Sequence, residues 1–206
     1  MNTYSLPLFP LNVVVCPGGV LPLRIFEARY LDMIRECLRD GSCFAIVTVL
    51  PPNDSEISSH FPVARTGTLV GILDVNVSTV GLMMIRCIGK HRININSFSQ
   101  QMDGLVIGEV TDIANDLALP VPHELEFTSS ALELLLDSLP EQGVSTENMP
   151  VMKPYQLDDA SWVANRWLEL LDLPLQQKQC LMQHESPIMR LRMINDILNS
   201  GLQKLH

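Results

Sequence analysis

The residue composition of the chain changes near residue 118. Before this point, runs of β-branched and other apolar residues are interrupted by glycine, whereas after it only Gly143 and Gly201 occur and helix-forming residues dominate. β-branched side chains favour strands, and unbranched ones favour helices. Strands and helices that are separated in this way along a sequence are typical of an α+β fold. We therefore predict a β-rich part over residues 1–118 and an α-helical bundle over residues 119–206.

Apolar spacing predicts the elements of the first part. Leu73, Val75 and Val77 alternate with polar residues, as in a strand with one buried face. Strands of this kind suit a small, mostly antiparallel curved barrel. The predicted strands cover residues 13–16, 20–26, 44–50 and 105–113, and further strands lie within 63–98, broken at Gly81 and Gly89. One inserted helix is expected from Phe26 to about residue 40, because apolar residues recur there at helical spacing and Gly41 can end it.

The second part is predicted to contain four helices. The first covers residues 123–139, and the next two begin near Asp158 and Pro174. The fourth begins at Ser186-Pro187, an N-cap followed by the proline favoured at the first helical position. Residues 141–154 are expected to form a flexible linker. In the first part, the polar, proline-containing loop 51–62 is long enough to be mobile or functional.

The charge balance argues against a general nucleic-acid binder. The 206 residues include 23 acidic and 14 basic side chains, which gives a net charge of -9, whereas binding to phosphate backbones depends on Lys and Arg. One alternative stays open. Arg24, Arg65, Arg86 and Arg92 all lie on predicted strands, and a local basic patch there would permit RNA or nucleotide recognition.

The sequence also bears on the cellular compartment. No apolar run approaches the ~20 residues that a membrane span needs, and the N-terminus lacks the basic segment of a secretory signal. The five cysteines are scattered and include no C-x-x-C pair, which is typical of reduced thiols in the cytosol. We therefore expect a cytoplasmic protein that does not contact membranes.

No motif of a common catalytic, cofactor or metal site is present. At the only Gly-Lys pair, Gly89-Lys90, Met84 and His91 stand where a P-loop needs a glycine and a hydroxyl residue. Phe127 replaces the second histidine of a zinc-binding H-E-x-x-H motif, and neither G-x-G-x-x-G nor G-x-S-x-G occurs. We therefore predict no enzymatic activity, no metal and no cofactor.

Two arrangements would make the chain a small-molecule hydrolase instead. Glu27, Glu109 and Asp112 lie in or beside the predicted barrel and would form an acid–base site if they titrated together. Cys43 would be a nucleophile if the fold placed His91 beside it. The structural interpretation, in which the carboxylates are exposed or ion-paired and the cysteines are buried, is the more common one.

A more specific pattern covers nearly the whole chain. The order and spacing of its opening residues resemble the N-terminal substrate-recognition domain of Lon proteases. Residues 65–68 resemble that family's Gly-Thr strand, residues 89–93 resemble its Gly-x-x-Arg-aliphatic strand, and the last helices resemble the tail of stand-alone bacterial members. The opening pattern is Leu6-Pro7-Leu8-Phe9-Pro10-Leu11, Val14, Pro17-Gly18, Leu21-Pro22-Leu23 and Phe26-Glu27-Ala28-Arg29-Tyr30.

The resemblance implies both a fold and a role. The fold would be a PUA-like β pseudo-barrel with one helix, followed by a helical bundle, and the role would be to capture unfolded or tagged protein segments for an ATPase and protease. Neither the Walker motif nor the Gly-Pro-Ser-Ala-Gly run of the family's catalytic serine occurs here. We therefore expect a non-catalytic module that binds unfolded or extended polypeptides, with a separate Lon-type protease as one candidate partner.

The motif residues have physical interpretations that favour structural roles. Proline stiffens the opening segment and glycine permits positive φ in a tight connection, while Glu27 suits a helix N-terminus. The motif residues interpreted as structural are Pro17, Gly18, Pro22, Phe26, Glu27, Arg29, Tyr30 and Gly67.

A separate set of residues is proposed to bind peptide. Adaptable methionine side chains suit promiscuous peptide binding, and an edge strand can accept an extended peptide. The expected surface is a groove between barrel and bundle, bordered by the loop 51–62. The candidate peptide-binding residues are Met83, Met84, Trp162 and Trp167.

Overall fold

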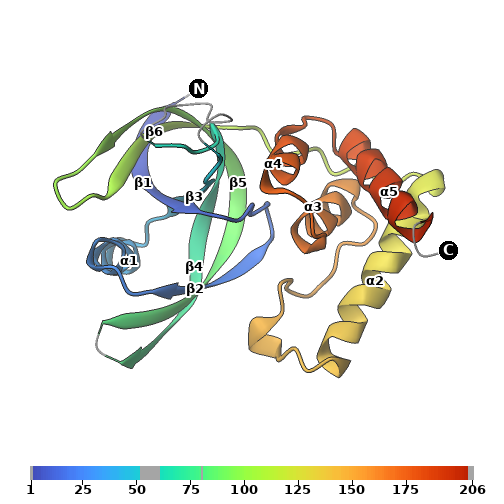
Figure 1. The fold of residues 1–206 in the computed structure, drawn as a ribbon, viewed down its shortest axis with the longest axis horizontal. Helices are drawn as coiled ribbons and strands as arrows, with labels where there is room; N and C mark the ends of the chain where they lie inside the picture. The colour runs from blue at the N-terminus through green and yellow to red at the C-terminus, as the bar shows by residue number, and fades with distance from the viewer. Residues whose placement is uncertain (1, 52–60, 80, 204–206) are drawn as a thin grey trace. The chain divides into compact units, whose positions relative to one another are not determined.

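A computed structural model describes residues 2–51, 61–79 and 81–203. The chain packs as two compact units, residues 1–115 and 116–206, which we call the barrel unit and the helical unit and describe separately. The predicted boundary at 118/119 lies three residues further along the chain. Figure 1 shows the strands in the first unit, in blue to green, and the later helices in the second, in yellow to red.

The barrel unit confirms the predicted α+β class with a mostly antiparallel sheet. Its six strands are arranged in the order β2-β5-β4-β3-β1-β6, and β5 also pairs with β6. Five of the strands therefore close into a ring, and β2 extends the sheet beyond β5. The elements are β1 (Thr3–Leu11), β2 (Val20–Ile25), α1 (Ala28–Asp40), β3 (Phe44–Thr48), β4 (Thr66–Thr79), β5 (Leu82–Gln100) and β6 (Val106–Asp112).

The length of β5 is what allows the ring to close. Its first half, from Met83 to Ile88, pairs with β2, and its second half, from Ile93 to Gln100, pairs with β6. Register shifts along its ladders with β4 and β6 mark β-bulges, which bend a strand and increase its twist. The single parallel pair joins β1 to β3.

The two faces of the strands form two separate cores. On β3, Ala45 and Val47 belong to one apolar cluster with residues of β1, β5 and β6, while Phe44 and Ile46 belong to a second cluster that includes the buried face of α1. All five residues of β3 are therefore buried. The alternation of side chains along a strand explains this division, because neighbouring residues point to opposite faces.

One prediction for the N-terminal segment is wrong. The first strand is β1, which contains Pro7 and Pro10, whereas the predicted strand 13–16 is an irregular segment. This segment is buried, but side chains hold its backbone in place of a ladder: Thr48 Oγ1 donates to the Val13 carbonyl at 3.1 Å, and Thr68 Oγ1 donates to the Val15 carbonyl at 2.6 Å. Apolar residues therefore mark burial here without marking a strand.

The predicted break at Gly89 is also wrong, because Gly89 lies inside β5. A Cβ at this position would overlap the carbonyl oxygen of Cys16. The backbone of Gly89 accepts a hydrogen bond from Gly18 N at 2.8 Å and donates one to Gly19 O at 2.9 Å. This glycine permits the close approach of a distant segment and does not interrupt the strand. Gly81, at φ 84°, does occupy the predicted turn.

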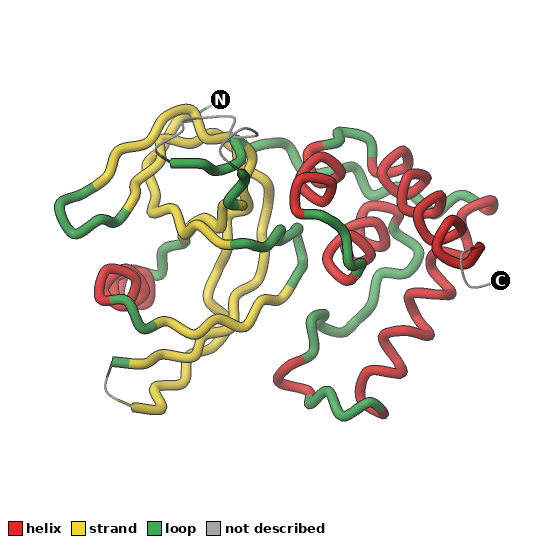
Figure 2. Tube along the Cα trace, viewed as in Figure 1, coloured by secondary structure: helices red, strands yellow, loops and turns green. Residues whose placement is uncertain are grey.

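The described residues of the helical unit form four α-helices, as predicted, and Figure 2 shows them in red. Two of them begin with polar caps. Ser186, the predicted cap, accepts a hydrogen bond at its Oγ from Met189 N at 3.3 Å, and Asp159 accepts one from Ser161 N at 2.8 Å. The predicted linker 141–154 contains only a short 3-10 turn. The elements are η2 (His123–Leu125), α2 (Glu126–Glu141), η3 (Thr146–Asn148), α3 (Ala160–Leu170), α4 (Leu175–Gln183) and α5 (Pro187–Gln203).

A buried polar network lies inside the helical unit. The guanidinium of Arg190 is 1% exposed and donates to Asp116 Oδ2 at 2.9 Å and to Asn165 Oδ1 at 2.7 Å. It also donates to the carbonyls of Leu181 and His184, at 3.2 and 2.8 Å. These bonds tie α5 to α3, to the end of α4 and to the start of the unit. Over the described residues, no helix is long and apolar enough to cross a bilayer.

Candidate functional site

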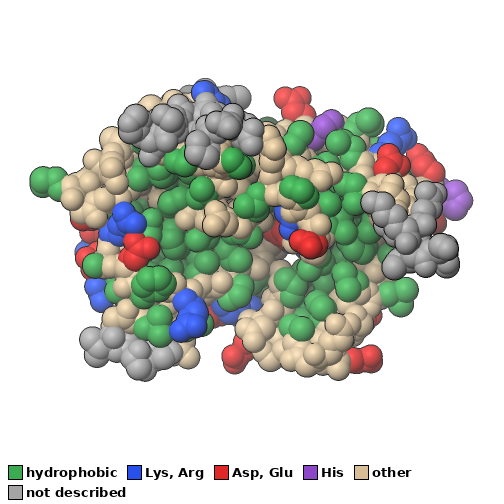
Figure 3. Space-filling model, viewed as in Figure 1, with side chains coloured by type: hydrophobic (Ala, Val, Ile, Leu, Met, Phe, Trp, Pro, Cys, Tyr) green, Lys and Arg blue, Asp and Glu red, His purple; other side chains and the backbone are tan. Residues whose placement is uncertain are grey.

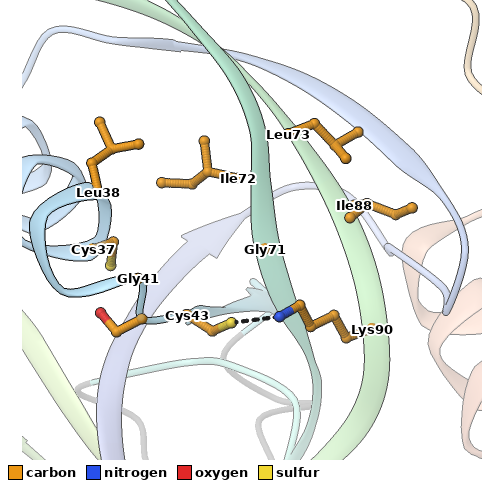
Figure 4. A pocket seen from close by; sticks show the side chains of 10 residues that line it. Cys37, Leu38, Gly41, Cys43, Gly71, Ile72, Leu73, Ile88 and Lys90 are labelled. Atoms are coloured by element: carbon orange, nitrogen blue, oxygen red, sulfur yellow. Dashed lines mark hydrogen bonds between the residues drawn. The ribbon is translucent and has the colours of Figure 1, made fainter.

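A hollow of about 420 Å³ opens in the barrel unit beside the end of α1. It lies where β3 and β4 separate, with the residues that follow α1 on one side and the middle of β4 on the other (Figure 4). We call this place the β3–β4 fork. Its ten lining residues are Cys37, Leu38, Gly41, Ser42, Cys43, Gly71, Ile72, Leu73, Ile88 and Lys90.

The fork leaves part of one sheet edge uncovered. Pairing between β3 and β4 ends at Phe44 and Val70. Beyond that point β4 continues to Thr79 and pairs only with β5, so that no strand among the described residues pairs with its other edge. The backbone groups along this edge are in position to bond with a further extended segment.

The walls of the hollow are mainly apolar. Leu38 on α1 is 48% exposed and Leu73 on β4 is 39% exposed, while Ile72 and Ile88 are partly buried. The exposure of Leu73 has a local cause, because the register between β4 and β5 shifts between Ile72 and Asp74. A bulged residue points away from the regular alternation, and here it places a leucine at the opening.

Lys90 supplies the only charged side chain among the ten lining residues, and three features place it there. The β4–β5 register shifts at Leu69/Val70, so that Lys90 lies in a bulge between the paired residues Gly89 and His91. Its side chain then crosses Gly71, where a Cβ would lie 2.7 Å from Lys90 Cε. Its Nζ reaches Cys43 and donates to Sγ at 3.1 Å, as Figure 4 shows.

The arrangement combines three binding elements in one place: an unpaired strand edge, exposed aliphatic side chains and one ammonium group. An extended peptide can use all three, because its backbone bonds to an edge, its apolar side chains fill a hollow and a carboxylate pairs with a cation.

Glu27, Arg29 and Tyr30 of the Phe-Glu-x-Arg-Tyr motif contact one another and neighbouring elements at the start of α1. Arg29 binds Glu27 at 2.6 Å, donates to the Gly104 carbonyl at 3.0 Å and lies over the ring of Tyr30. Tyr30 is buried and packs against Phe9, with ring centroids 4.2 Å apart. Burial raises the pKa of the Tyr30 hydroxyl. These contacts join the helix to β1 and to the turn before β6.

The other motif residues lie apart from the fork. Pro17 and Gly18 form the turn before β2, where Gly18 has a φ of 78°. Gly67 lies close to β3, because a Cβ there would be 2.8 Å from the Ile46 carbonyl oxygen. Pro22 is exposed on β2, the edge strand. Phe26 was expected on the buried face of the helix, but it precedes α1 and is 69% exposed.

Three of the four candidate peptide-binding residues are buried. Met83 is 8% exposed and packs in the core beneath α1. Trp162 and Trp167 are 9% and 6% exposed, and Trp167 Nε1 donates to the Thr128 carbonyl at 2.8 Å. Met84, on the opposite face of β5, is partly exposed. The predicted groove between barrel and bundle concerns two units that are described separately, and residues 52–60 of its bordering loop lie outside the described residues.

The four arginines of the nucleic-acid alternative do not form one exposed group. Arg92 is 6% exposed, and Arg86 forms an ion pair with Asp74 at 3.1 Å. Arg24 and Arg65 are exposed on different parts of the barrel unit. On the face shown in Figure 3, the coloured Lys and Arg side chains of this unit are separated by hydrophobic and other residues.

The residues of the two hydrolase alternatives have separate partners. Glu109 accepts a hydrogen bond from Ser5, and Glu27 binds the arginine two residues after it. Asp112 accepts hydrogen bonds from Tyr4 and His91 at 2.6 and 2.8 Å, which lower the pKa of its carboxyl group. His91 therefore faces a carboxylate, while Cys43 faces Lys90. The described residues contain no group of three or more His, Cys, Asp or Glu side chains placed to hold a metal ion.

The residues of the fork were not predicted as a site. In the sequence, Lys90 belongs to a failed P-loop and to the stretch 89–93 that resembles the family's Gly-x-x-Arg-aliphatic strand. Leu38, Cys43 and Leu73 belong only to a predicted helix, a candidate nucleophile pair and a predicted strand. One signal was present in the sequence: Gly71 and Gly89 interrupt two apolar strands, and such glycines indicate bulges or close approaches. The signal does not reveal which side chain crosses which glycine.

Comparisons with known proteins agree with this fold. The solved Lon N-terminal domain protein from Xanthomonas campestris is 33% identical, with a TM-score of 0.74, and the match covers 94% of this chain and 98% of that one. The N-terminal domain of the Mycobacterium avium complex Lon protease has the same fold, with a TM-score of 0.62, 21% identity and coverage of 94% and 97%.

A curated relative and a family description extend the comparison. Protein cereblon from Danio rerio is 24% identical over 123 residues, which are 59% of this chain and only 28% of cereblon. Residues 5–200 match the protein family described as the ATP-dependent protease La (LON) substrate-binding domain. Because this match spans both units, the chain belongs to the family of Lon substrate-binding domains, a non-catalytic domain type that recognises substrates.

Proposed function

We propose that this protein binds unfolded or extended polypeptide segments, and that the β3–β4 fork is the binding surface. The observation that carries the proposal is the unpaired edge of β4 beside the exposed leucines Leu38 and Leu73. Membership of a substrate-binding family supports a protein or peptide as the ligand.

Recognition of many different sequences follows from the two kinds of contact. Backbone hydrogen bonds to a strand edge are the same for every peptide, and the side-chain hollow then selects for apolar residues. Unfolded proteins expose both features together, whereas folded ones cover them. A shallow hollow lined by Leu38, Ile72 and Leu73 suits low-affinity capture of many clients.

The proposed module acts without chemistry of its own. Its expected role is to hold a client for a separate machine, and a Lon-type protease acting in trans is the partner that the family suggests. No cofactor is needed for this role, because the proposed contacts are hydrogen bonds and apolar packing.

Titration of a labelled, reduced unfolded polypeptide, followed by fluorescence anisotropy, tests the proposal. Replacing Leu73 by glutamate places a charge in the apolar hollow and should weaken binding by about tenfold, a loss of ~1.4 kcal/mol. Leu38→Glu, from the opposite wall, should act in the same direction.

Leu134→Glu is the matched control. Leu134 is also an exposed leucine, at 74%, but it lies on α2 of the helical unit. It should bind the polypeptide like the unaltered protein. No binding by the unaltered protein at high micromolar concentration would refute the proposed function. Equal binding by all the variants would refute the location at the fork.

A further inference from the structure

We call the space beside the uncovered edge of β4 the lane. It is closed at one end. From Gly71 onward no strand in the described part of the chain pairs with the outer edge of β4, but at Phe44 the chain enters this lane and becomes β3. The residues Gly41, Ser42 and Cys43 line the hollow at that end. A peptide lying along β4 therefore cannot continue past Gly71, and one of its ends must lie there.

Among the ten described residues that line the hollow, the one charged side chain stands at this closed end. Lys90 Nζ crosses Gly71 and donates to Cys43 Sγ at 3.1 Å, so that the ammonium lies where the lane stops. A positive charge in this position attracts a carboxylate and repels the ammonium of a peptide N-terminus. The protein is acidic overall, with a net charge of -9, so this local cation opposes the general charge.

The direction of the strands agrees with the sign of the charge. β3 runs antiparallel to β4 and begins opposite Val70. A peptide in the same lane and with the same direction as β3 would also run antiparallel to β4. Its C-terminus would then point towards Gly71, and its α-carboxylate would come to the ammonium of Lys90.

We propose that the β3–β4 fork recognises the C-terminal end of a polypeptide, with the α-carboxylate on Lys90 and an apolar terminal side chain between Leu38 and Leu73. This inference rests on the proposed function and names the part of the client that is bound. The N–H···S contact to Cys43 is a weak hydrogen bond that a carboxylate can replace with a stronger, charge-assisted one.

Two backbone features place the side chain of Lys90 at the fork. The bulge between Gly89 and His91 redirects the side chain, and the missing Cβ of Gly71 leaves room for its stem. The stem in turn covers part of the strand, so that the charged group is presented at the end of an apolar surface.

The test compares one labelled peptide in two chemical forms, with the full chain as the receptor. The peptide is a short extended segment that ends in leucine, either with a free α-carboxylate or as the C-terminal amide. The free acid should bind about tenfold more tightly than the amide, as expected for one charge-assisted hydrogen bond at a partly exposed site. The preference should decrease as the salt concentration rises.

Variants of the protein then assign the preference to Lys90. Lys90→Met keeps most of the aliphatic stem and should reduce the ratio of acid to amide affinity to about one, mostly through weaker binding of the acid. Gly71→Ala keeps the lysine but displaces its stem, and it should lower the ratio as well. Lys153→Met, a change in the helical unit, is the control and should keep the full ratio.

The outcomes separate this inference from the proposed function. Equal binding of acid and amide by the unaltered protein would overturn C-terminal recognition while leaving peptide binding intact. If an amidated peptide with aspartate before its terminal leucine bound as tightly as the free acid, a side-chain carboxylate would be the ligand and the inference would again be wrong. Absence of binding to every peptide and to unfolded protein would overturn both proposals.

Discussion

Replacing Arg190 by leucine should destabilise the helical unit more than almost any other single change. The guanidinium is 1% exposed and makes four hydrogen bonds, to Asp116, Asn165, Leu181 and His184. Leucine fills part of the volume but donates none of these bonds. The carboxylate of Asp116, whose side chain is 8% exposed, would keep the hydrogen bond from Ser161 Oγ at 2.6 Å but would lose the guanidinium beside it.

The magnitude follows from the loss of this guanidinium beside a buried carboxylate. Breaking a buried ion pair by removing one partner costs about 3–5 kcal/mol. The two carbonyls and the Asn165 oxygen lose donors as well, but these losses are coupled to the first and do not simply add. We therefore expect the free energy of unfolding to fall by about 4 kcal/mol. With a urea dependence of about 2 kcal/mol per molar, the midpoint would fall by roughly 2 M.

The positions of the tryptophans make the assay specific to one unit. Both tryptophans of the chain, Trp162 and Trp167, are buried on α3, so tryptophan fluorescence during urea unfolding reports on the helical unit alone. Arg192→Leu is the matched control. Arg192 lies one half-turn further along α5 and its ion pair with Glu124 is exposed, so its loss should cost less than about 1 kcal/mol.

A double variant checks the physical reason. When Asp116 is also replaced by leucine, the carboxylate that paired with Arg190 is removed as well, and the double variant should be more stable than Arg190→Leu by more than about 1 kcal/mol. A loss below about 1 kcal/mol for Arg190→Leu would refute the reasoning from burial. A double variant as unstable as the sum of its two single variants would refute the assignment to the ion pair.

Two further predictions concern the barrel unit. Gly89→Ala should lower its stability by about 1–3 kcal/mol, because the new Cβ would overlap the Cys16 carbonyl, and tyrosine fluorescence or far-ultraviolet circular dichroism during urea unfolding would measure the loss. Burial, followed by a hydrogen bond to the Asp112 carboxylate, raises the pKa of Tyr4 from 10.0 to about 12. The folded state therefore holds this proton more tightly than the unfolded state, and the corresponding stabilisation is present below pH 10 and is lost as the pH rises through about 12. The difference in ultraviolet tyrosinate titration between the unaltered protein and Tyr4→Phe should show a step near pH 12, and a step near pH 10 for Tyr4 would contradict the prediction.

Local patterns explain which parts of the fold the sequence could predict. The α1 helix, its end at Gly41 and the cap at Ser186 all follow from residues within a few positions of one another. Helix periodicity and capping are local properties, so a single sequence contains them. The segment 13–16 was predicted wrongly because buried apolar residues look the same whether a ladder or a side chain holds their backbone.

The candidate site could not be predicted in the same way. The aromatic side chains of Trp162 and Trp167 suit peptide binding, but packing inside the helical unit buries them. No motif marks Lys90 as a binding residue, because it stands at a variable position of the Gly-x-x-Arg-aliphatic pattern. Its place at the fork depends on a bulge in one strand and a missing Cβ in another. Such features arise from pairing between residues far apart in the chain, which no periodicity records.

The sequence by itself determined the α+β class, the division into a strand-rich and a helix-rich part, and the family of the chain. These depend on local spacing and on an ordered motif that extends through the first strands. Only the tertiary structure decided that β3 and β4 separate after Val70 and that Lys90 crosses Gly71 to meet Cys43. The reason is physical: a site is made by close approach, and close approach depends on which distant backbones can pack together without a clash.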